Sequence, residues 1–362
     1  MQYKVIGLMS GSSLDGLDLA YVHFEESGGQ WHFEIRETDC VPYTPALRER
    51  LSGAGALSAR EYLLLHTEYG HYLGTAVNNF IEKYGLSYQV QLVASHGHTS
   101  FHLPEKQMTA QLGDGAALAA VTGIHTITDF RGTDIALGGQ GAPVVPIGEK
   151  LLFGEYDLFL NIGGIANISA KLPATAGFDV CPANRILNLL AQDTEKGYDE
   201  DGVLASGGSV QDQLLNKLNG FAYYRKPFPK SLSNDFGLKE IFPLIEKANL
   251  SREDALRTYT EHIAMQVADA INSLPPPGHA AAPLKLLITG GGAHNRFLLE
   301  RIKKFLAGTY IEPVVPPKEL VDYKEALVIA LMGALRWREE ENVLSSVTGS
   351  ARNNINGAIW SS

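Results

Sequence analysis

The sequence predicts an α/β protein made of two similar halves, and three stretches carry this prediction. The apolar residues 5–9 lead into a Gly/Ser turn, and a second apolar run, residues 17–24, follows it. Residues 158–169 repeat this order of strand, glycine turn and strand near the middle of the chain. Residues 286–295 are an apolar strand that runs into three glycines and then into a helix. The first two stretches each indicate a pair of adjacent strands.

The turns in these stretches have the composition of phosphate-binding loops. Gly11 and Gly16 allow backbone dihedrals that other residues resist, so the first turn can close around an anion. Asp15 stands where a carboxylate can hold a phosphate-bound Mg²⁺. The turn also contains the hydroxyl donors Ser10, Ser12 and Ser13. Taken alone, the first stretch would be interpreted as an ordinary Gly/Ser hairpin turn, because such turns are common.

Two phosphate-type hairpins, one in each half, together with a late GGG turn, indicate a particular nucleotide-binding class. This is the arrangement with which actin, Hsp70 and the sugar kinases bind ATP. Neither GxGxxG nor GxxxxGK[ST] occurs in the chain, so a Rossmann or Walker site is not expected.

The composition restricts the kind of protein and its partners. The length of 362 residues is sufficient for about two domains, and the net charge of −10 argues against nucleic acid or an anionic membrane as a partner. The only cysteines are Cys40 and Cys181, so a disulfide scaffold or a zinc ribbon is not expected. Neither a signal-peptide pattern nor an apolar stretch of roughly 20 residues is evident. We therefore expect a cytoplasmic enzyme, with a homodimer as an open alternative to a monomer.

The first half continues with strands and one long helix. The strands expected after the opening pair are residues 31–40, 91–94, 109–112 and 124–128. Ser58 to Glu61 form a capping box, which predicts a helix from there to about Gly85. The glycine-dense residues 138–143 are the expected domain crossing, giving domains 1–134 and 135–362.

The second half begins with the repeated hairpin. A helix is expected to follow the next strand from about Pro182, because proline is tolerated in a first helical turn. Residues 197–208 and 223–236 are expected to be loops. Residues 251–272 and 323–341 are expected to be helices, and the second of these could pack back on the first domain.

Several stretches, spread from one end of the chain to the other, match one known family. They are residues 7–16, 95–99, 138–143, 161–167, 177–179, 290–295 and 346–349. On these motifs the chain resembles the 1,6-anhydro-N-acetylmuramic acid kinases of peptidoglycan recycling. The resemblance implies the actin-like ATPase fold, with two RNase H-like domains and an interdomain cleft for the nucleotide.

The resemblance also implies the reaction. Water adds at the anomeric carbon of 1,6-anhydro-N-acetylmuramic acid, the anhydro bridge opens, and O6 takes the γ-phosphoryl group of ATP in the presence of Mg²⁺. The product is N-acetylmuramic acid 6-phosphate. Asp179 falls on the aspartate of the family's GFD motif, where it would act as the general base for the water. Without the motif, Asp179 would be interpreted as a turn residue at a strand end.

The remaining roles follow from chemistry together with the resemblance. The residues expected around the nucleotide are Gly11, Ser12, Ser13, Asp15, Gly16, Asn161, Gly163, Gly164, Gly291, Gly292 and Asn295, with Asp15 near Mg²⁺. The residues expected around the sugar are His96, His98, Arg131, Asn184 and Glu325. Arg131 suits a carboxylate or phosphate, because guanidinium binds such groups bidentately, but it could also be a surface arginine. Glu325 could instead serve only the N-terminus of the last helix.

The chain departs from the family pattern mainly on the expected sugar side. The departures are at His98, Gly132, Thr133, Cys181, Ala183, Asn188 and the loop 229–235. Three alternatives therefore remain: a kinase for another anhydro or plain amino sugar, a non-catalytic nucleotide-binding sensor on the same fold, and a metal hydrolase that uses the histidines of residues 96–102.

Overall fold

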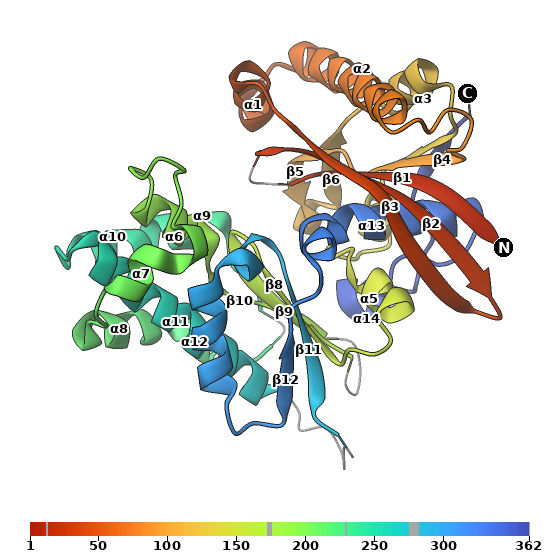
Figure 1. The fold of residues 1–362 in the computed structure, drawn as a ribbon. Coiled ribbons are helices and arrows are strands. Elements are labelled where there is room, and N and C mark those ends of the chain that lie inside the picture. Colours follow the sequence, from red (N-terminus) through yellow and green to blue (C-terminus); the bar gives the residue numbers. More distant parts are fainter. Residues whose placement is uncertain (12–13, 172–175, 229, 275–281, 362) are drawn as a thin grey trace. The chain divides into compact units, whose positions relative to one another are not determined.

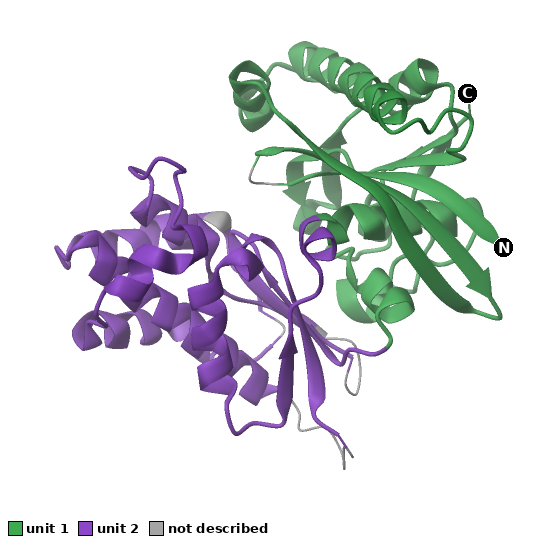
Figure 2. Cartoon of the chain, viewed as in Figure 1, with its two compact units in different colours: residues 1–154, 323–362 green, residues 155–322 purple. Residues whose placement is uncertain are grey.

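The computed structural model describes residues 1–11, 14–171, 176–228, 230–274 and 282–361. They form two compact units (Figure 2). Unit 1 comprises Met1–Gly154 and Tyr323–Ser362, and unit 2 comprises Glu155–Asp322. Unit 1 therefore extends beyond the expected boundary at residue 134, and the chain returns to it after residue 322.

A buried carboxylate explains why the glycine-dense loop stays in unit 1. Asp134 is fully buried, and its Oδ2 accepts a hydrogen bond from the Gly141 N–H at 2.8 Å. Its Oδ1 accepts from Thr348 Oγ1 at 2.8 Å and from Asn354 Nδ2 at 2.9 Å. The loop is thus tied to the C-terminal segment of the chain, a pairing that sequence spacing does not reveal.

The main sheet of unit 1 has the strand order β13-β7-β4-β1-β2-β3 (Figure 1). Its strands are β1 (Gln2–Ser10), β2 (Gly16–Ser27), β3 (Gln30–Pro42), β4 (Leu92–Ser95), β7 (Thr126–Thr128) and β13 (Ala358–Trp360). Strands β1, β2 and β3 are antiparallel neighbours, whereas β4 and β7 continue the sheet in parallel from β1. The predicted opening hairpin and third strand are confirmed.

Helices cover both faces of this sheet, and successive side chains of β1 point alternately to one face and to the other. The helices of unit 1 are α1 (Pro45–Ser52), α2 (Ala59–Lys83), α3 (Gly115–Thr122), α4 (Gly132–Ala136), α5 (Pro146–Leu152), α13 (Lys318–Trp337) and α14 (Ser345–Thr348), with α13 beginning in unit 2. Ile6 and Leu8 share a core cluster with the apolar residues of α2. Gly7, on the opposite face, lies against the backbone of α13 at Ala326. The predicted capping box at Ser58 is present.

The strands expected at residues 109–112 and 124–128 are confirmed as β6 (Met108–Leu112) and β7. However, β6 pairs with β5 (His98–Leu103) in a separate two-stranded sheet and is mostly not buried. The distant β13 pairs antiparallel with β7, a neighbour that was not predicted. The final helix begins at Lys318 rather than Tyr323.

Unit 2 repeats the same strand topology. The strands β8 (Leu158–Ile162), β9 (Ile165–Ala170), β10 (Ala176–Pro182), β11 (Leu284–Thr289) and β12 (Ile311–Val314) have the order β10-β9-β8-β11-β12. β8, β9 and β10 are antiparallel neighbours, and β11 and β12 continue in parallel from β8. Three antiparallel strands followed by parallel ones, in the same order in both units, make each unit RNase H-like. The chain has the predicted actin-like ATPase fold.

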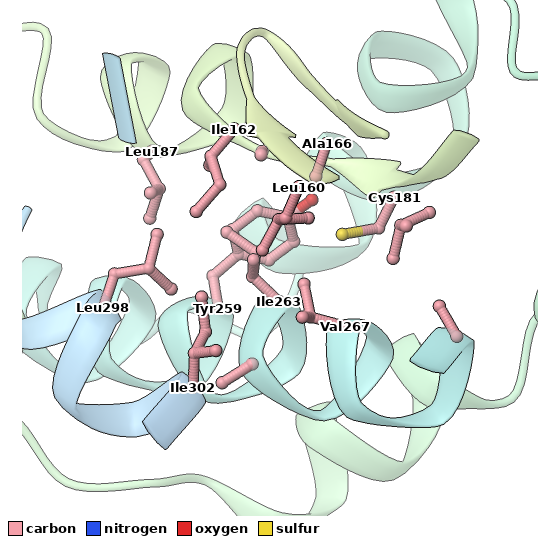
Figure 3. Packing of buried hydrophobic residues seen from close by; sticks show 14 of the residues in the cluster. Leu160, Ile162, Ala166, Cys181, Leu187, Tyr259, Ile263, Val267, Leu298 and Ile302 are labelled. Atoms are coloured by element: carbon pink, nitrogen blue, oxygen red, sulfur yellow. The ribbon is translucent and has the colours of Figure 1, made fainter. Parts of the chain in front are cut away.

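Helices and a large apolar core complete unit 2. Its helices are α6 (Asn184–Leu190), α7 (Val203–Gly207), α8 (Asp212–Asn219), α9 (Asn234–Phe236), α10 (Phe242–Glu246), α11 (Arg252–Ser273) and α12 (Arg296–Leu306). Fully buried Tyr259 and Ile263 of α11 pack among residues of β8 and α12, including Leu160 and Ile302 (Figure 3). The segment 197–208 is not all loop, because it contains α7.

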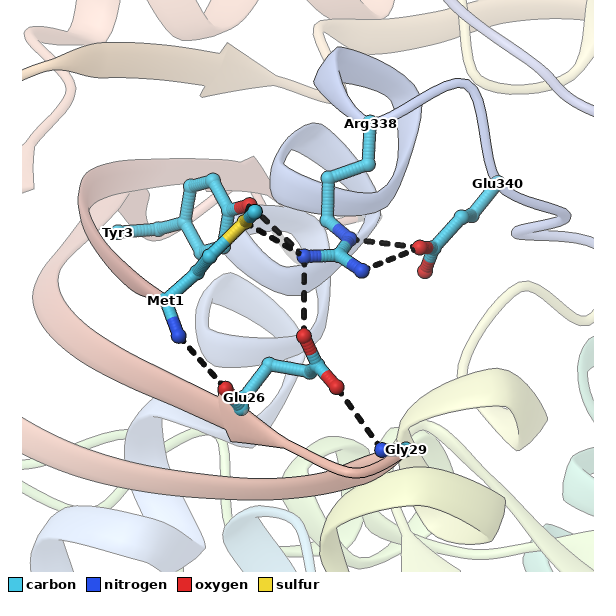
Figure 4. Close-up of polar contacts among 6 residues, drawn as sticks. All are labelled: Met1, Tyr3, Glu26, Gly29, Arg338 and Glu340. Carbon is cyan, nitrogen blue, oxygen red and sulfur yellow. Dashed lines mark hydrogen bonds and ion pairs between the residues drawn. The ribbon is translucent and has the colours of Figure 1, made fainter.

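The end of α13 is fixed to the opening strands by one arginine. The Arg338 guanidinium contacts the Glu26 carboxylate at 3.0 Å, the Tyr3 hydroxyl at 2.9 Å and the Glu340 carboxylate at 2.6 Å (Figure 4). It also lies over the rings of Tyr3 and Trp31. The N-terminal ammonium donates to the Glu26 carbonyl at 2.7 Å, so the chain start belongs to the same cluster.

Candidate active site

The predicted site residues fall into two groups, one in each unit. Unit 1 holds Gly11, Asp15, Gly16, His96, His98, Arg131 and Glu325. Unit 2 holds Asn161, Gly163, Gly164, Asp179, Asn184, Gly291, Gly292 and Asn295. Ser12 and Ser13 lie outside the described residues.

The first turn ends where β2 begins. Gly16 does not have the left-handed backbone that was expected; instead, a Cβ there would lie 2.7 Å from the Val41 carbonyl oxygen. Its glycine identity is therefore explained by the close pairing of β2 with β3. Asp15, just before it, is exposed, so its carboxylate is accessible to a hydrated ion.

The buried His96 and the partly buried Arg131 form a pair beyond the end of β4. Arg131 Nε donates to His96 Nε2 at 2.9 Å. His96 Nε2 must then carry the lone pair, so the ring proton is on Nδ1, which lies 2.9 Å from the Gly97 carbonyl and donates to it. Burial, with a smaller contribution from the Arg131 charge, lowers the pKa of His96 to about 3, so the ring is neutral near pH 7.

The same pair orients the guanidinium. Burial lowers the pKa of Arg131 to about 10, and the nearby Glu325 carboxylate opposes this shift. Because the Nε–H donates to His96, the guanidinium is held in one orientation, and its two Nη groups can bind an oxyanion bidentately.

Glu325 lies on α13 near Arg131 and is partly buried. Burial raises the pKa of its carboxyl group, and the charges of Lys324 and Arg131 oppose the rise. The alternative that Glu325 serves a helix N-terminus is wrong, because α13 begins at Lys318. A carboxylate paired by charge with a partly buried arginine is typical of a site that positions a polar ligand.

His98 is fixed by a different partner from that of His96. Its Nδ1 lies 3.1 Å from Ser10 Oγ, and both side chains are buried. The Ser10 hydroxyl also accepts from Tyr43, so it is used within the protein and is not the phosphate donor that the first turn was expected to supply. Burial lowers the pKa of His98, which therefore is also neutral near pH 7. Within the part of the chain that the structure describes, no three His, Cys, Asp or Glu side chains are grouped so as to hold a metal ion. The histidines thus give no support to the metal-hydrolase alternative.

In unit 2 the two predicted turns are adjacent. β8 and β11 run in parallel, and Asn161 is paired with Thr289, so both strands reach their turns at the same edge. Asn184, at the start of α6, donates through Nδ2 to the Ile162 carbonyl at 3.0 Å and through its backbone N–H to the Gly163 carbonyl at 3.1 Å. A Cβ at Gly291 would lie 3.4 Å from Asn184 Nδ2. Asn184 therefore links the second phosphate-type turn to the GGG turn.

The glycines of these turns are required for different reasons. Gly290 has φ = +83°, and a Cβ there would lie 2.4 Å from Asn161 Oδ1, so the fold itself requires glycine. A Cβ at Gly292 would lie 2.2 Å from Ile162 Cγ2. By contrast, the atom nearest to a Cβ at Gly163 would be 3.4 Å away, and at Gly164 3.9 Å, and neither has a left-handed backbone. The protein's own packing thus leaves room for a Cβ at Gly163 and at Gly164.

Asn295 has a structural task. Its side-chain oxygen accepts from the Leu298 N–H at 2.9 Å and so caps the N-terminus of α12. The cap fixes the direction in which α12 leaves the GGG turn.

Asp179 lies on the edge strand β10, where a register shift between Asp179 and Cys181 interrupts the pairing with β9. Such bulges re-aim side chains and are frequent beside active sites. The Leu232 N–H donates to Asp179 Oδ2 at 2.8 Å. Burial raises the pKa of the carboxyl group, and the Leu232 hydrogen bond opposes this. The result is a partly buried, oriented carboxylate, which suits a general base.

The segment around residues 223–232 supports Asp179, a role that was missed in the sequence. The Tyr223 hydroxyl donates to the Asp179 carbonyl at 2.7 Å, and the Asp179 N–H donates to the Lys230 carbonyl at 3.1 Å. The aromatic, proline-broken composition of this segment indicated an ordered loop, but its partner in β10 was not evident.

The chain matches one known protein family along almost its whole length. The family model described as anhydro-N-acetylmuramic acid kinase matches residues 3–362. A protein of that name from Aliivibrio fischeri is 34% identical over 99% of each chain. One of the same name from Vibrio parahaemolyticus is 33% identical over 98% of each chain.

A solved structure offers a more distant likeness. It is titled as the activator of the 2-hydroxyisocaproyl-CoA dehydratase from Clostridium difficile with bound ADPNP, and it has a TM-score of 0.44 and 14% identity, covering 94% of this chain and 99% of the other. Among the described residues, no helix is long and apolar enough to cross a membrane. On the family match and the full-length identity, the chain belongs to the anhydro-N-acetylmuramic acid kinase family.

Proposed function

We propose that this enzyme uses ATP and water to convert 1,6-anhydro-N-acetylmuramic acid into N-acetylmuramic acid 6-phosphate in cell-wall recycling. The observation that carries the proposal is Asp179, a partly buried carboxylate oriented at a strand bulge by the Leu232 N–H. Membership of the kinase family supports the substrate and the reaction class. Because ATP is the phosphoryl donor, we place the reaction in the cytoplasm.

Asp179 acts as general base. It accepts a proton from water while the water oxygen forms a bond to C1 of the sugar and the C1–O6 bond breaks. O6 takes the γ-phosphorus, and the bond between that phosphorus and the β–γ bridging oxygen breaks to release ADP. The oxygen atom from water therefore ends at C1 and not in the phosphate.

The nucleotide is held by the glycine turns. Gly163 and Gly164 have no steric need to be glycine within the protein, which supports their assignment to close contact with phosphate groups. Gly291 and Gly292 are assigned to the nucleoside end. Asn184, which was expected at the sugar, is assigned to the nucleotide instead, because its side chain lies beside both glycines. The capping role of Asn295 makes it a positioning residue for this turn.

The first turn supplies the remaining nucleotide contacts, including the ion. Gly11 and Gly16 flank the part of this turn that contains Asp15. The exposed Asp15 carboxylate fits Mg²⁺, which keeps several waters and takes one or two carboxylates beside substrate phosphates. When bound, the ion would neutralise charge on the transferred phosphoryl group.

Arg131 is assigned to an anionic group of the sugar. Its Nε is fixed by His96, so its Nη groups can make a bidentate contact with a carboxylate, such as that of the sugar's lactyl group. Glu325 is assigned to sugar hydroxyl or amide groups, because a carboxylate accepts from such donors. His98 is assigned to a sugar oxygen.

Replacing Asp179 tests the proposal. We expect Asp179→Asn to fold and to bind ATP and sugar normally, because the size of the side chain is kept, while turnover falls at least about 10²–10⁴-fold. Mass spectrometry of product formed in H₂¹⁸O should place the label at C1. Near-normal turnover of the variant, or label in the phosphate, would contradict the mechanism.

The wild-type assay separates the alternatives. Turnover of a different amino sugar in preference to the anhydro sugar would identify another sugar kinase. ATP binding without turnover of any amino sugar would identify a sensor. Sedimentation velocity of the same preparation would test for the homodimer, which stays a prediction.

A further inference from the structure

A buried chain of hydroxyl groups in unit 1 ends on His98. The Tyr69 and Tyr43 hydroxyl oxygens are 2.6 Å apart, and the Tyr43 hydroxyl donates to Ser10 Oγ at 2.7 Å. Ser10 Oγ is 3.1 Å from His98 Nδ1. All four side chains are buried, with at most 6% of each residue exposed. They come from α2, the residue after β3, the end of β1 and the start of β5.

The hydrogen atoms of this chain can be placed by counting donors. Tyr43 has a single hydroxyl hydrogen, which it donates to Ser10, so the hydrogen between the two tyrosines must come from Tyr69. Burial raises the pKa of Tyr43 to about 12, and it also raises the pKa of Tyr69. Both hydroxyl groups therefore keep their hydrogens near pH 7. Each link of the chain therefore donates in the same direction, toward Ser10.

Ser10 then determines the state of His98. Its oxygen already accepts from Tyr43, and its own hydrogen needs an acceptor, since a buried hydroxyl left without one costs free energy. Among the described residues, both His98 Nδ1 and the Tyr69 hydroxyl interact with Ser10. A neutral imidazole nitrogen is a stronger acceptor than a phenol oxygen, so the Ser10 hydrogen is assigned to His98 Nδ1. An accepting Nδ1 leaves the proton of the neutral ring on Nε2.

The neighbouring histidine shows the opposite arrangement. His96 has its proton on Nδ1, because its Nε2 accepts from Arg131. Two histidines separated by one residue are thus held as opposite tautomers by different partners. Burial alone cannot produce this difference, because it lowers the pKa of both rings.

We propose that Tyr69, Tyr43 and Ser10 are positioning residues that hold His98 in the Nε2–H tautomer, so that it donates a hydrogen bond to an acceptor oxygen of the sugar. The donation to sugar rests on the proposed function, whereas the tautomer belongs to the free protein. The expected ligand atom is an ether, carbonyl or carboxylate oxygen, because the ring offers a donor there.

The first test measures the tautomer without substrate. Long-range ¹H–¹⁵N spectra of ¹⁵N-histidine-labelled protein distinguish a protonated ring nitrogen from an unprotonated one, and loss of the signal in His98→Gln assigns it. We expect wild-type His98 to carry its proton on Nε2. Ser10→Ala removes the donor to Nδ1, and in Tyr43→Phe the Ser10 oxygen is free to accept from Nδ1–H instead. We therefore expect a second population with Nδ1–H in both variants.

The second test is kinetic. Tyr43→Phe and Ser10→Ala should raise KM for the sugar roughly three- to tenfold, as expected for one misdirected hydrogen bond, with kcat within about twofold and KM for ATP unchanged. Tyr72→Phe is the matched control, because its ring stacks on Tyr69 with centroids 5.8 Å apart but its hydroxyl is not a link of the chain. It should change neither the tautomer nor KM, and melting curves of all variants measure any general destabilisation.

The outcomes separate the two proposals. A wild-type His98 with its proton on Nδ1, or variants that change neither the tautomer nor KM, would overturn the positioning role. If wild-type protein does not turn over the anhydro sugar, the proposed function fails, and the spectra still decide whether the hydroxyl chain sets the tautomer.

Discussion

Gly7 of β1 lies directly against the backbone of α13, so we expect a substitution there to destabilise the fold. A Cβ at Gly7 would lie 2.0 Å from the carbonyl oxygen of Ala326 and 2.9 Å from the backbone nitrogen of Ala330. Both atoms are helix backbone and cannot rotate away. Gly7→Ala therefore requires α13 to move by about 1 Å or more to restore a normal contact.

The expected cost follows from this geometry. Overpacking a core typically costs about 1–3 kcal/mol, and a rigid backbone neighbour places Gly7→Ala at the upper end. For a unit of about 200 residues, this lowers Tm by roughly 6–12 °C. α13 also carries Glu325, so kcat/KM for the sugar should fall, by up to about 10²-fold for a displacement of this size.

Scanning calorimetry and steady-state kinetics measure both effects. Gly207→Ala is the matched control, because no atom lies within 4 Å of a Cβ there and the backbone is not left-handed. This control should melt at or slightly above the wild-type temperature. A Gly7→Ala protein that melts within about 2 °C of wild type with unchanged kcat/KM would refute the reasoning.

Three other perturbations give separate predictions. Asp134→Asn should destabilise unit 1 by at least about 2 kcal/mol, because an amide replaces a buried carboxylate that accepts from three donors; an unchanged denaturation midpoint would contradict this. Gly163→Val should lose ATP affinity by calorimetry with little change in melting temperature, because a Cβ there meets only ordinary contacts while the branched side chain occupies the assigned phosphate space; normal affinity would remove this turn from the site. Turnover should fall as pH drops through the raised pKa of Asp179, because only the deprotonated carboxylate accepts a proton; a flat acid limb with Asp179 intact would argue against the base.

The sequence alone predicted those structural features that are determined by residues close together in the chain. The strand–turn–strand order around Gly163, the capping box at Ser58 and the strand before Gly290 are local patterns, and the structure contains all three. The family motifs added Asp179, which no local pattern distinguishes from an ordinary residue at a strand end. The predicted fold class was correct because each hairpin, and also the GGG turn, is a single continuous stretch of sequence whose strands and turn can be recognised locally.

Only the tertiary structure decided what depends on residues far apart in the chain. The sheet edge formed by β13, the attachment of the 138–143 loop through Asp134 and the support of Asp179 by residues 223–232 each join distant segments. Periodicity and turn chemistry report on a few neighbouring residues, so they cannot reveal such pairs.

The states of the site residues were decided in the same way. In the sequence, His96 and His98 are separated by one residue and were equivalent candidates for the sugar site. In the folded protein one accepts from Arg131 and the other is joined to Ser10, so their protons lie on different nitrogens. The sequence by itself determined which groups could do chemistry here, and the fold decided their protonation and direction, because these depend on burial and on partners brought together only by folding.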